Sequence, residues 1–434
     1  IEMKFCLYKK KCEFCENIVI NNFEIDMYSL VFSGTELQKL TTQYERRSLG
    51  LNREELISQI ESCCLHDILE GIYQFHINYV GGLYINGKEK GTIDYLCQNL
   101  IIRKLYQNIK RVYNVSQANR NQIIRQVKII LEDPYPLWII RLDIKSFYES
   151  IDRDVVLNKL KSDSRVNYQT IELLENLFSH PLIYSIKGLP RGLSISSAIS
   201  ELFMKYFDLD VQRINGVYYY ARFVDDIIIF CNCEKARDEV YNTIPVLLEK
   251  MKLTLNQDKS YVLDETKLTS NQKFSYLGYS FSLKKIGKNR KQKNELLVSI
   301  AENKVEVIKT KLTKAFVRFI HDKNYDMLVN RIKYLTGNFT VGNIADLTPI
   351  KSGVYFNYKM ISESEKERQL RELNLYYNKM LHCKKGSFGY KLSSLLSKEQ
   401  KKRLSKYSFY FGFENHVSHY FHSKLLCEIK KCWL

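Results

Sequence analysis

The chain has 434 residues, 45% of them hydrophobic, and a formal net charge of +18. This length allows two or three domains or one enzyme with several lobes, and the charge favours a polyanionic partner, nucleic acid first and a membrane surface second. Because there is no run of about 18 apolar residues and no signal-peptide core near residue 1, we expect no membrane span and a cytosolic location.

The cysteines and histidines give little reason to expect a metal site. Eleven scattered cysteines do not form a disulfide framework. Cys12 and Cys15 form one CxxC pair, but no second pair follows at a zinc-ribbon distance, so free thiols are favoured. His416, His419 and His422 recur at every third position, which favours one mixed helix face.

Hydrophobic periodicity predicts helices and strands in a mixed order. The predicted helical segments are most of 35–133, then 152–160, 170–178, 195–214, 235–251 and 301–434. The predicted strands are 136–144, 217–223, 227–232, 260–265, 274–283 and 295–300. The link between the strands at 217–223 and 227–232 is too short for a parallel crossover, which predicts an α+β fold with an antiparallel sheet backed by helices.

Three aspartates stand where predicted strands end. Asp225 and Asp226 lie between two strands, at a hairpin tip, and Asp143 ends the strand at 136–144. If these strands are neighbours, Asp143 and Asp225 converge, and convergent carboxylates suit hard divalent cations. Two such ions about 4 Å apart serve in-line phosphoryl transfer. Taken alone, the Asp pair is also compatible with an ordinary hairpin turn.

The segments LDIKSFYESID (142–152), GLPRGLSISS (188–197), FVDD (223–226), LNQDKS (255–260) and FSYLGYSF (274–281) occur in a definite order. In order and spacing they resemble the palm motifs of reverse transcriptases, over about residues 100–285. The resemblance implies a right-hand polymerase of fingers, palm and thumb. The implied regions are an N-terminal helical region with fingers at 1–135, a palm at 136–300, a helical thumb at 301–380 and a basic, aromatic C-terminal extension at 381–434.

The resemblance also implies roles for individual residues. Asp143 and Asp225, with Ile144, would hold two Mg2+ ions, or Mn2+, and Asp226 would be the second acid of the pair. Tyr148 stands at the steric-gate position that favours deoxynucleotides, and Gly192 would let the backbone approach the nucleotide. The other implied nucleotide contacts are Arg191, Lys259, Arg111, Arg120 and Arg125. The implied primer grip consists of Phe274, Tyr276, Leu277, Gly278 and Tyr279.

Three positions depart from the usual motifs of the family. Arg191 replaces the glutamine before the motif glycine, Ser197 replaces a proline, and Phe223 replaces the tyrosine of YxDD. These changes resemble the bacterial defence-associated and abortive-infection branches. ANRNQIIRQ (118–126) and YLTGNF (334–339) are most similar to the type 3 defence-associated group, in particular to its member that copies a noncoding RNA. The implied partners are that RNA, a DNA product, deoxynucleoside triphosphates, and a second reverse transcriptase or further copies of this chain.

Two other functions stay open on the sequence. Some abortive-infection relatives extend DNA without a template from a protein side chain, and 31 tyrosines offer primers for such a reaction. A palm without activity would instead be an RNA-binding scaffold, although three retained acids argue against it. The interleaved basic and aromatic residues of 381–434 suit stacking on RNA bases, a hydrophobic core or an oligomer interface equally well.

Overall fold

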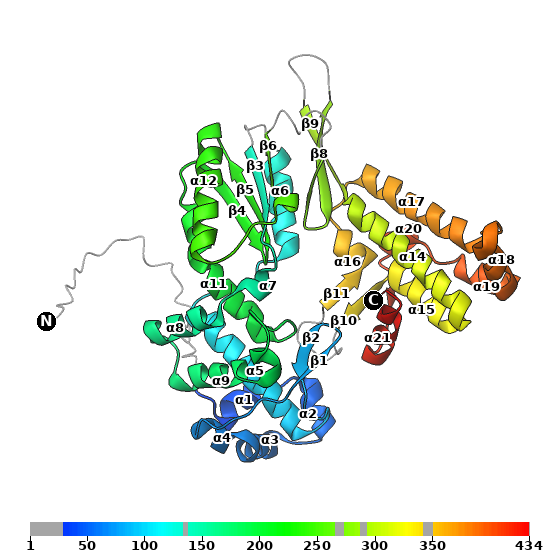
Figure 1. Ribbon diagram of the computed structural model, residues 1–434. Helices are drawn as coiled ribbons and strands as arrows, with labels where there is room; N and C mark the ends of the chain where they lie inside the picture. Colours follow the sequence, from blue (N-terminus) through cyan, green and yellow to red (C-terminus); the bar gives the residue numbers. More distant parts are fainter. Residues whose placement is uncertain (1–28, 133–137, 265–272, 287–292, 342–349, 434) are drawn as a thin grey trace, which may run out of the picture.

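The computed structural model describes residues 29–132, 138–264, 273–286, 293–341 and 350–433. Cys12 and Cys15 lie outside these ranges. The centre of the molecule is a four-stranded antiparallel sheet, the palm sheet, in the order β4-β5-β3-β6 (Figure 1). Its strands are β3 (Trp138–Asp143), β4 (Val217–Phe223), β5 (Asp226–Cys231) and β6 (Tyr261–Asp264). The expected α+β fold with an antiparallel sheet is confirmed.

The two central strands of the palm sheet are buried on both faces. Successive side chains of a strand point to opposite faces. Ile140 and Ile229 accordingly join one hydrophobic core, with helices α11 (Ser194–Gln212) and α12 (Glu234–Lys250). Ile139 and Ile228 join a second core on the other face, with helix α6 (Arg120–Glu132). This double burial explains the unbroken apolar run of β5.

Short helices and one hairpin precede and flank the palm sheet. Strands β1 (Ile77–Val80) and β2 (Leu83–Asn86) form an antiparallel hairpin, which the prediction of mostly helices over 35–133 missed. The missed signal is Gly81-Gly82, both at positive φ, between two short apolar runs. The helices are α1 (Gly34–Lys39), α2 (Gln43–Leu49), α3 (Arg53–Ile60), a π-helical turn (Glu61–Leu65), α4 (His66–Leu69), α5 (Ile93–Val112), α7 (Phe147–Ser150), α8 (Arg153–Asp163), α9 (Tyr168–Phe178) and α10 (Pro181–Tyr184).

A second antiparallel sheet, in the order β7-β8-β9, connects the palm to the C-terminal part of the chain. Its strands are β7 (Phe274–Tyr276), β8 (Tyr279–Ile286) and β9 (Lys293–Ile300). Phe274 and Phe281, cross-strand partners with stacked rings, pack into the core shared with α6. The segment predicted as one strand at 274–283 is therefore a hairpin, which brings the predicted primer-grip residues into one turn.

Residues 302–433 form a C-terminal module of helices around a small sheet, to the right of the palm in Figure 1. Its helices are α14 (Glu302–Asp322), α15 (Tyr325–Thr336), α16 (Val354–Tyr358), α17 (Glu363–Leu381), α18 (Gly386–Leu395), α19 (Lys398–Leu404), α20 (Phe409–Glu414) and α21 (Ser423–Lys431). Its strands are β10 (Asn338–Val341), β11 (Ile350–Gly353) and β12 (Ser418–His419), in the order β11-β10-β12. The expectation of helix throughout this region is thus wrong at the sheet, whose strands are too short to show a period.

The predicted boundary at residue 380 falls inside one packed unit. Leu404, Phe409 and Phe413 share a core with Leu312 and Phe316 of α14. β12 also pairs in parallel with β10. The division into a thumb and a separate extension stays a prediction, while the packing assigns most aromatic residues of this segment to the core.

Phe409 and Phe411 provide a matched test of this packing, since both lie in α20. Phe409 is fully buried and Phe411 is 56% exposed. We expect Phe409→Ala to lower the free energy of unfolding by about 3–5 kcal/mol, because it leaves a cavity in the core. Phe411→Ala should change it by less than about 0.5 kcal/mol, as surface substitutions do. Denaturant unfolding measures both, and equal effects would contradict the packing.

Candidate active site

The turn between β4 and β5, residues 223–226, is called here the acidic turn. Val224 and Asp225 are its two central residues, and Phe223 pairs with Asp226. Both acids were expected at the tip, but Asp226 is already the first residue of β5, directly opposite Asp143 of β3. The main-chain oxygen of Asp225 accepts a hydrogen bond from the Ile144 nitrogen at 3.1 Å. The structure therefore gathers Asp143, Ile144, Asp225 and Asp226 at the ends of two neighbouring strands, as predicted.

Asp226 is held by an ion pair on the sheet surface. Arg141 Nη2 lies 2.9 Å from Asp226 Oδ1, and its Nε lies 3.3 Å from the same oxygen. Arg141 is two residues before Asp143, so its side chain shares the face of Asp143 and Asp226. The sequence analysis missed Arg141, although its spacing from Asp143 was a usable signal. This pairing gives the Asp226 carboxylate a partner inside the protein, and its role as the second acid of the pair stays a prediction.

Asp143 is nearly buried, and its carboxylate has two polar neighbours from the segment before β6. Lys259 Nζ lies 3.2 Å from Oδ1, and Asn256 Nδ2 donates to Oδ2 at 3.1 Å. The Asn256 nitrogen also donates to the Asp143 main-chain oxygen at 2.7 Å. Lys259 was predicted near the triphosphate, and the structure does bring it to the acids.

Asp225 carries the clearest sign of an electrostatic cost. Burial, together with the Asp226 and Asp143 carboxylates, raises the pKa of Asp225 above its ordinary value. Hard divalent cations would relieve this repulsion, and carboxylate oxygens are the ligands they prefer. The donor chemistry of Asp143 and Asp225 fits such ions. Within the described residues, however, no group of three or more His, Cys, Asp or Glu side chains is arranged to hold a metal.

Tyr148, the predicted steric gate, is braced by the GLPRG loop. Its main-chain oxygen accepts from the Leu189 nitrogen at 2.8 Å. Arg191 lies over its ring at 5.7 Å from the centroid, and the same guanidinium pairs with Glu149 through Nε–Oε1 at 2.6 Å and Nη2–Oε2 at 3.0 Å. Arg191 therefore has a local carboxylate partner, Glu149, which the sequence analysis did not single out.

Gly192 faces protein rather than open space. It has a φ of +106°, and a Cβ there would meet the Tyr84 main-chain oxygen at 2.6 Å. The Tyr84 nitrogen also donates to the Arg191 oxygen at 2.7 Å. Gly192 is therefore required because strand β2 lies against its backbone. Its contact with a nucleotide stays a prediction.

The predicted primer grip lies in the turn between β7 and β8, residues 276–279, called here the grip turn. Leu277 and Gly278 both have positive φ, +46° and +81°. Tyr276 and Tyr279 are fully buried, and Tyr276 Oη donates to the Asp226 main-chain oxygen at 3.3 Å. The grip turn is thereby attached to the first residue of β5.

The three arginines predicted for triphosphate contacts lie in different places. Arg120 donates to the Leu277 oxygen and lines the same cavity as Asp143. Arg111 lies near Lys104 at the end of α5, and Arg125 is exposed on α6. Neither Arg111 nor Arg125 lines that cavity. The structure does not gather the three arginines around the acids.

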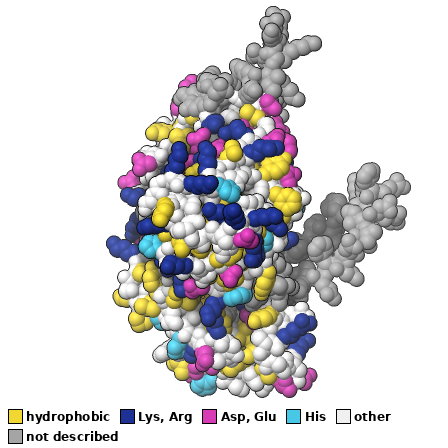
Figure 2. Space-filling model, turned by 90° about the vertical axis from the view of Figure 1, so that its right-hand side faces the viewer, with side chains coloured by type: hydrophobic (Ala, Val, Ile, Leu, Met, Phe, Trp, Pro, Cys, Tyr) yellow, Lys and Arg dark blue, Asp and Glu magenta, His cyan; other side chains and the backbone are white. Residues whose placement is uncertain are grey.

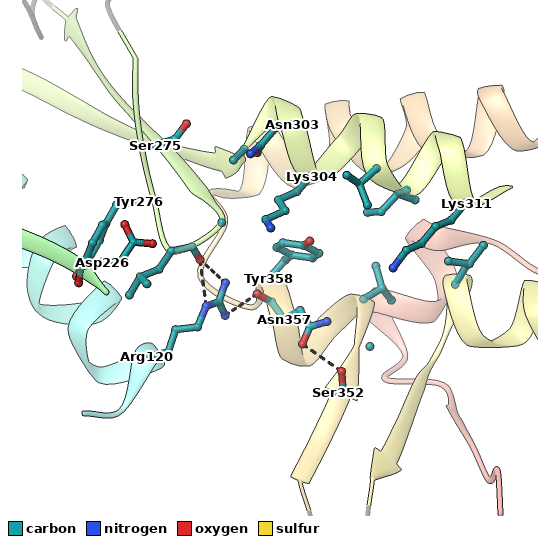
Figure 3. Close-up of a pocket in the computed structure, with 18 of the residues that line it drawn as sticks. Arg120, Asp226, Ser275, Tyr276, Asn303, Lys304, Lys311, Ser352, Asn357 and Tyr358 are labelled. Atoms are coloured by element: carbon teal, nitrogen blue, oxygen red, sulfur yellow. Dashed lines mark hydrogen bonds between the residues drawn. The ribbon is translucent and has the colours of Figure 1, made fainter. Parts of the chain in front are cut away.

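A cavity of about 690 Å³ extends from the acids to the C-terminal module (Figure 3). Asp143, Asp226 and Arg141 line its palm end, and the grip turn forms one wall. Lys304 and Lys311 of α14 line the far end. The cavity thus has carboxylates at one end and lysines at the other. Such an arrangement suits a polyanion whose phosphates lie at the lysines and whose end lies at the carboxylates.

Residues 92–281 match the family described as reverse transcriptase (RNA-dependent DNA polymerase). The chain is similar to the solved structure of a C-terminally truncated apo telomerase from Candida tropicalis, at 14% identity and a TM-score of 0.35, over 45% of this chain and 46% of that one. It is also similar to a telomerase from Candida albicans with a fragment of telomeric RNA, at 14% identity and a TM-score of 0.35, over 76% of this chain and 53% of that one.

The chain thus covers about half the length of these two telomerase structures. No curated protein matches it. Residues 92–281 are a reverse transcriptase domain. The matched range contains the palm sheet, the acidic turn, Tyr148, Lys259 and the grip turn, so the expected palm fold is confirmed, while the bounds 136–300 stay a prediction. The roles of single residues in the reverse transcriptase domain stay predictions.

Replacing Asp225 tests its electrostatic cost. Since its pKa is higher in the folded chain, its contribution to stability is greatest below its ordinary value of 3.8 and is lost as the pH rises through the folded-state pKa. Without divalent cations at pH 7, Asp225→Asn should therefore raise the melting temperature, and the gain should shrink towards pH 3.8. Asp226→Asn should lower the melting temperature, because it leaves half-buried Arg141 without its carboxylate. Scanning calorimetry in EDTA measures both, and a loss of stability in Asp225→Asn would refute the repulsion.

Proposed function

We propose that this protein is an RNA-directed DNA polymerase that uses deoxynucleoside triphosphates and a noncoding RNA template, in the antiviral defence of a bacterial cell. The observation that carries the polymerase activity is the juxtaposition of Asp143 and Asp225 at the ends of β3 and β5, inside a reverse transcriptase domain. The defence role rests on Phe223, Arg191 and Ser197, and the noncoding RNA template rests on the segments ANRNQIIRQ (118–126) and YLTGNF (334–339).

Each part of the site has a physical task in this reaction. Asp143 and Asp225 would hold two Mg2+ ions, which supply activation of a primer 3′-hydroxyl and stabilisation of the triphosphate charge. Lys259, at 3.2 Å from Asp143, adds positive charge beside the reacting phosphates. The Tyr148 ring, which lies against the Arg191 guanidinium, would exclude a 2′-hydroxyl by its bulk. The grip turn would place the primer end, because it is attached to Asp226 through Tyr276.

Activity measurements with variants test the proposal directly. Purified protein with its copurifying RNA should incorporate deoxynucleotides, and sequencing should give a product complementary to that RNA. Asp143→Ala with Asp225→Ala should lower incorporation at least about 10³-fold, because charge stabilisation in the transition state is lost. Asp238→Ala is a matched control, since this acid is exposed on α12 away from the cavity, and it should leave the rate unchanged.

The same assay separates the other functions. A random or homopolymeric product that ribonuclease treatment does not affect would indicate untemplated synthesis, and a tyrosine-linked product would identify a protein primer. RNA binding without incorporation by the wild-type protein would indicate a scaffold. Any of these results would overturn the proposal. The mass of the purified complex would reveal a second reverse transcriptase or further copies of this chain.

The basic surface predicts how RNA binding depends on salt. Figure 2 shows Lys and Arg side chains spread over the face that lies on the right in Figure 1, where the C-terminal module is located. If phosphate contacts dominate, RNA affinity should fall about 10³-fold or more between 50 and 200 mM salt, as expected for about six phosphate contacts. Fluorescence anisotropy measures this slope, and an affinity independent of salt would contradict a phosphate-dominated interface.

A further inference from the structure

The acidic turn and the grip turn share a strained backbone. Val224 is the first central residue of the acidic turn and has a φ of +62°. Leu277 is the first central residue of the grip turn and has a φ of +46°. Neither is a glycine, and a residue with a side chain costs about 1–3 kcal/mol in this region. Surrounding contacts must therefore hold both turns.

In each turn, an arginine binds the main-chain oxygen of the strained residue. Arg222 Nη1 donates to the Val224 oxygen at 3.1 Å. Arg120 donates to the Leu277 oxygen from Nε at 3.0 Å and from Nη2 at 2.5 Å. This oxygen belongs to the central peptide of the turn, and a flip of that peptide converts one turn type into another. The two guanidinium groups thus fix the orientation of the peptide that leads into Asp225 and into Gly278.

Arg222 is itself held by a complete set of partners. Its side chain is 3% exposed, and it pairs with Asp208 through Nε and Nη2, both at 2.8 Å. Glu201 accepts from Nη2 at 2.7 Å and from Nη1 at 3.3 Å. With the bond to Val224, every one of its five N–H groups has an acceptor. Asp208 and Glu201 lie seven residues apart on one face of α11, so the guanidinium connects this helix to the acidic turn.

Arg120 connects three segments around the grip turn (Figure 3). It is the first residue of α6, and its Nη1 donates to the Asn357 oxygen of α16 at 3.0 Å. Its guanidinium also lies over the Tyr279 ring at 5.0 Å from the centroid. A Cβ on Gly278 would meet Nη2 at 3.2 Å, which shows how closely the arginine and the turn approach.

We propose that Arg222 and Arg120 are positioning residues, each holding one strained turn in its working conformation. Arg222 orients the Asp225 carboxylate towards Asp143, and Arg120 orients the grip turn for the primer end. This inference rests on the proposed function, which identifies the two ligands as a divalent cation at Asp225 and a primer end at the grip turn. Lysine keeps the charge but lacks the planar fork, so it cannot satisfy the turn and the other acceptors together.

The two arginines predict separate defects, so each variant is a control for the other. Arg222→Lys should lower kcat about 10²-fold and weaken Mn2+ binding about 10-fold, with the KM for primer–template within about 3-fold of wild type. Arg120→Lys should raise that KM and the Kd for primer–template about 10-fold, with Mn2+ binding and kcat nearly unchanged. Arg237→Lys, in an exposed ion pair of α12, should change none of these values. Calorimetry measures Mn2+ binding, and anisotropy in Ca2+ measures primer–template binding.

Relief of strain provides a rescue experiment. Glycine adopts positive φ readily, so Val224→Gly in the Arg222→Lys background should restore about 10-fold in kcat, and Leu277→Gly should lower the KM of Arg120→Lys. If Arg222→Lys folds poorly, Glu201→Gln is an alternative, because it keeps the shape of the side chain but weakens its hydrogen bonds with Arg222. This variant should also lower kcat and Mn2+ affinity, by smaller factors.

Two results would overturn the inference. The first is that Arg222→Lys and Arg120→Lys both lower kcat, Mn2+ affinity and primer–template affinity in equal proportion. These losses would follow the melting temperature, and the glycine substitutions would not restore them. The second is wild-type behaviour of both lysine variants. If the wild-type protein extends no primer, the proposed function fails, whereas the Mn2+ and primer–template affinities still decide the roles of the two arginines.

Discussion

Repulsion between carboxylates is the constraint around which the centre of this protein is built. Asp143, Asp225 and Asp226 meet at the ends of two neighbouring strands, and two further acids, Glu201 and Asp208, lie behind the acidic turn. Burying such charges is unfavourable unless each finds a partner. The partners are Lys259 for Asp143, Arg141 for Asp226, and Arg222 for the pair on α11. Burial, followed by the Asp226 and Asp143 carboxylates, raises the pKa of Asp225, and a cation bound there would relieve this cost.

The double burial of β3 and β5 makes this concentration of charge possible. Strands packed between two hydrophobic cores cannot shift in register without exposing apolar side chains. Asp143 and Asp226 are therefore fixed opposite each other by residues such as Ile139, Ile140 and Ile229, which lie outside the site. The acids occupy the ends of the strands, where the cores stop and the cavity begins. Apolar packing thus sets the register of the two strands, and the ion pairs of Lys259 and Arg141 hold the side chains of Asp143 and Asp226.

Local patterns allowed the sequence to predict much of this, and non-local pairing accounts for what it missed. The acidic turn was predictable, because two apolar runs separated only by VDD are a local signal. The grip turn was identified by its resemblance to the family's primer grip, although the apolar pattern alone predicted one strand over 274–283. The strand position of Asp226 was not, since it depends on pairing with Asp143 across the sheet. β10 and β12 were missed because a two- to four-residue strand has no period to detect. Glu149, Arg141 and Arg222 were not predicted, because each pairs with a residue far away in the sequence. Glu149 pairs with Arg191, Arg141 with Asp226, and Arg222 with Glu201 and Asp208.

The arginines show why positive charge in the sequence does not by itself indicate a phosphate contact. Arg120, Arg141, Arg191 and Arg222 all have partners inside the protein, either carboxylates or main-chain oxygens. The two cavity lysines of α14 differ, since within the described residues neither Lys304 nor Lys311 forms an ion pair with a carboxylate, whereas Lys259 at the palm end pairs with Asp143. Burial, followed by the nearby Lys430 and Lys304, lowers the pKa of Lys311, so an anion placed there would relieve the same kind of repulsion that a cation relieves at Asp225. In the part of the chain that the structure describes, the far end of the cavity thus carries positive charge without a carboxylate partner, whereas at the palm end Lys259 and Arg141 balance the carboxylates of Asp143 and Asp226.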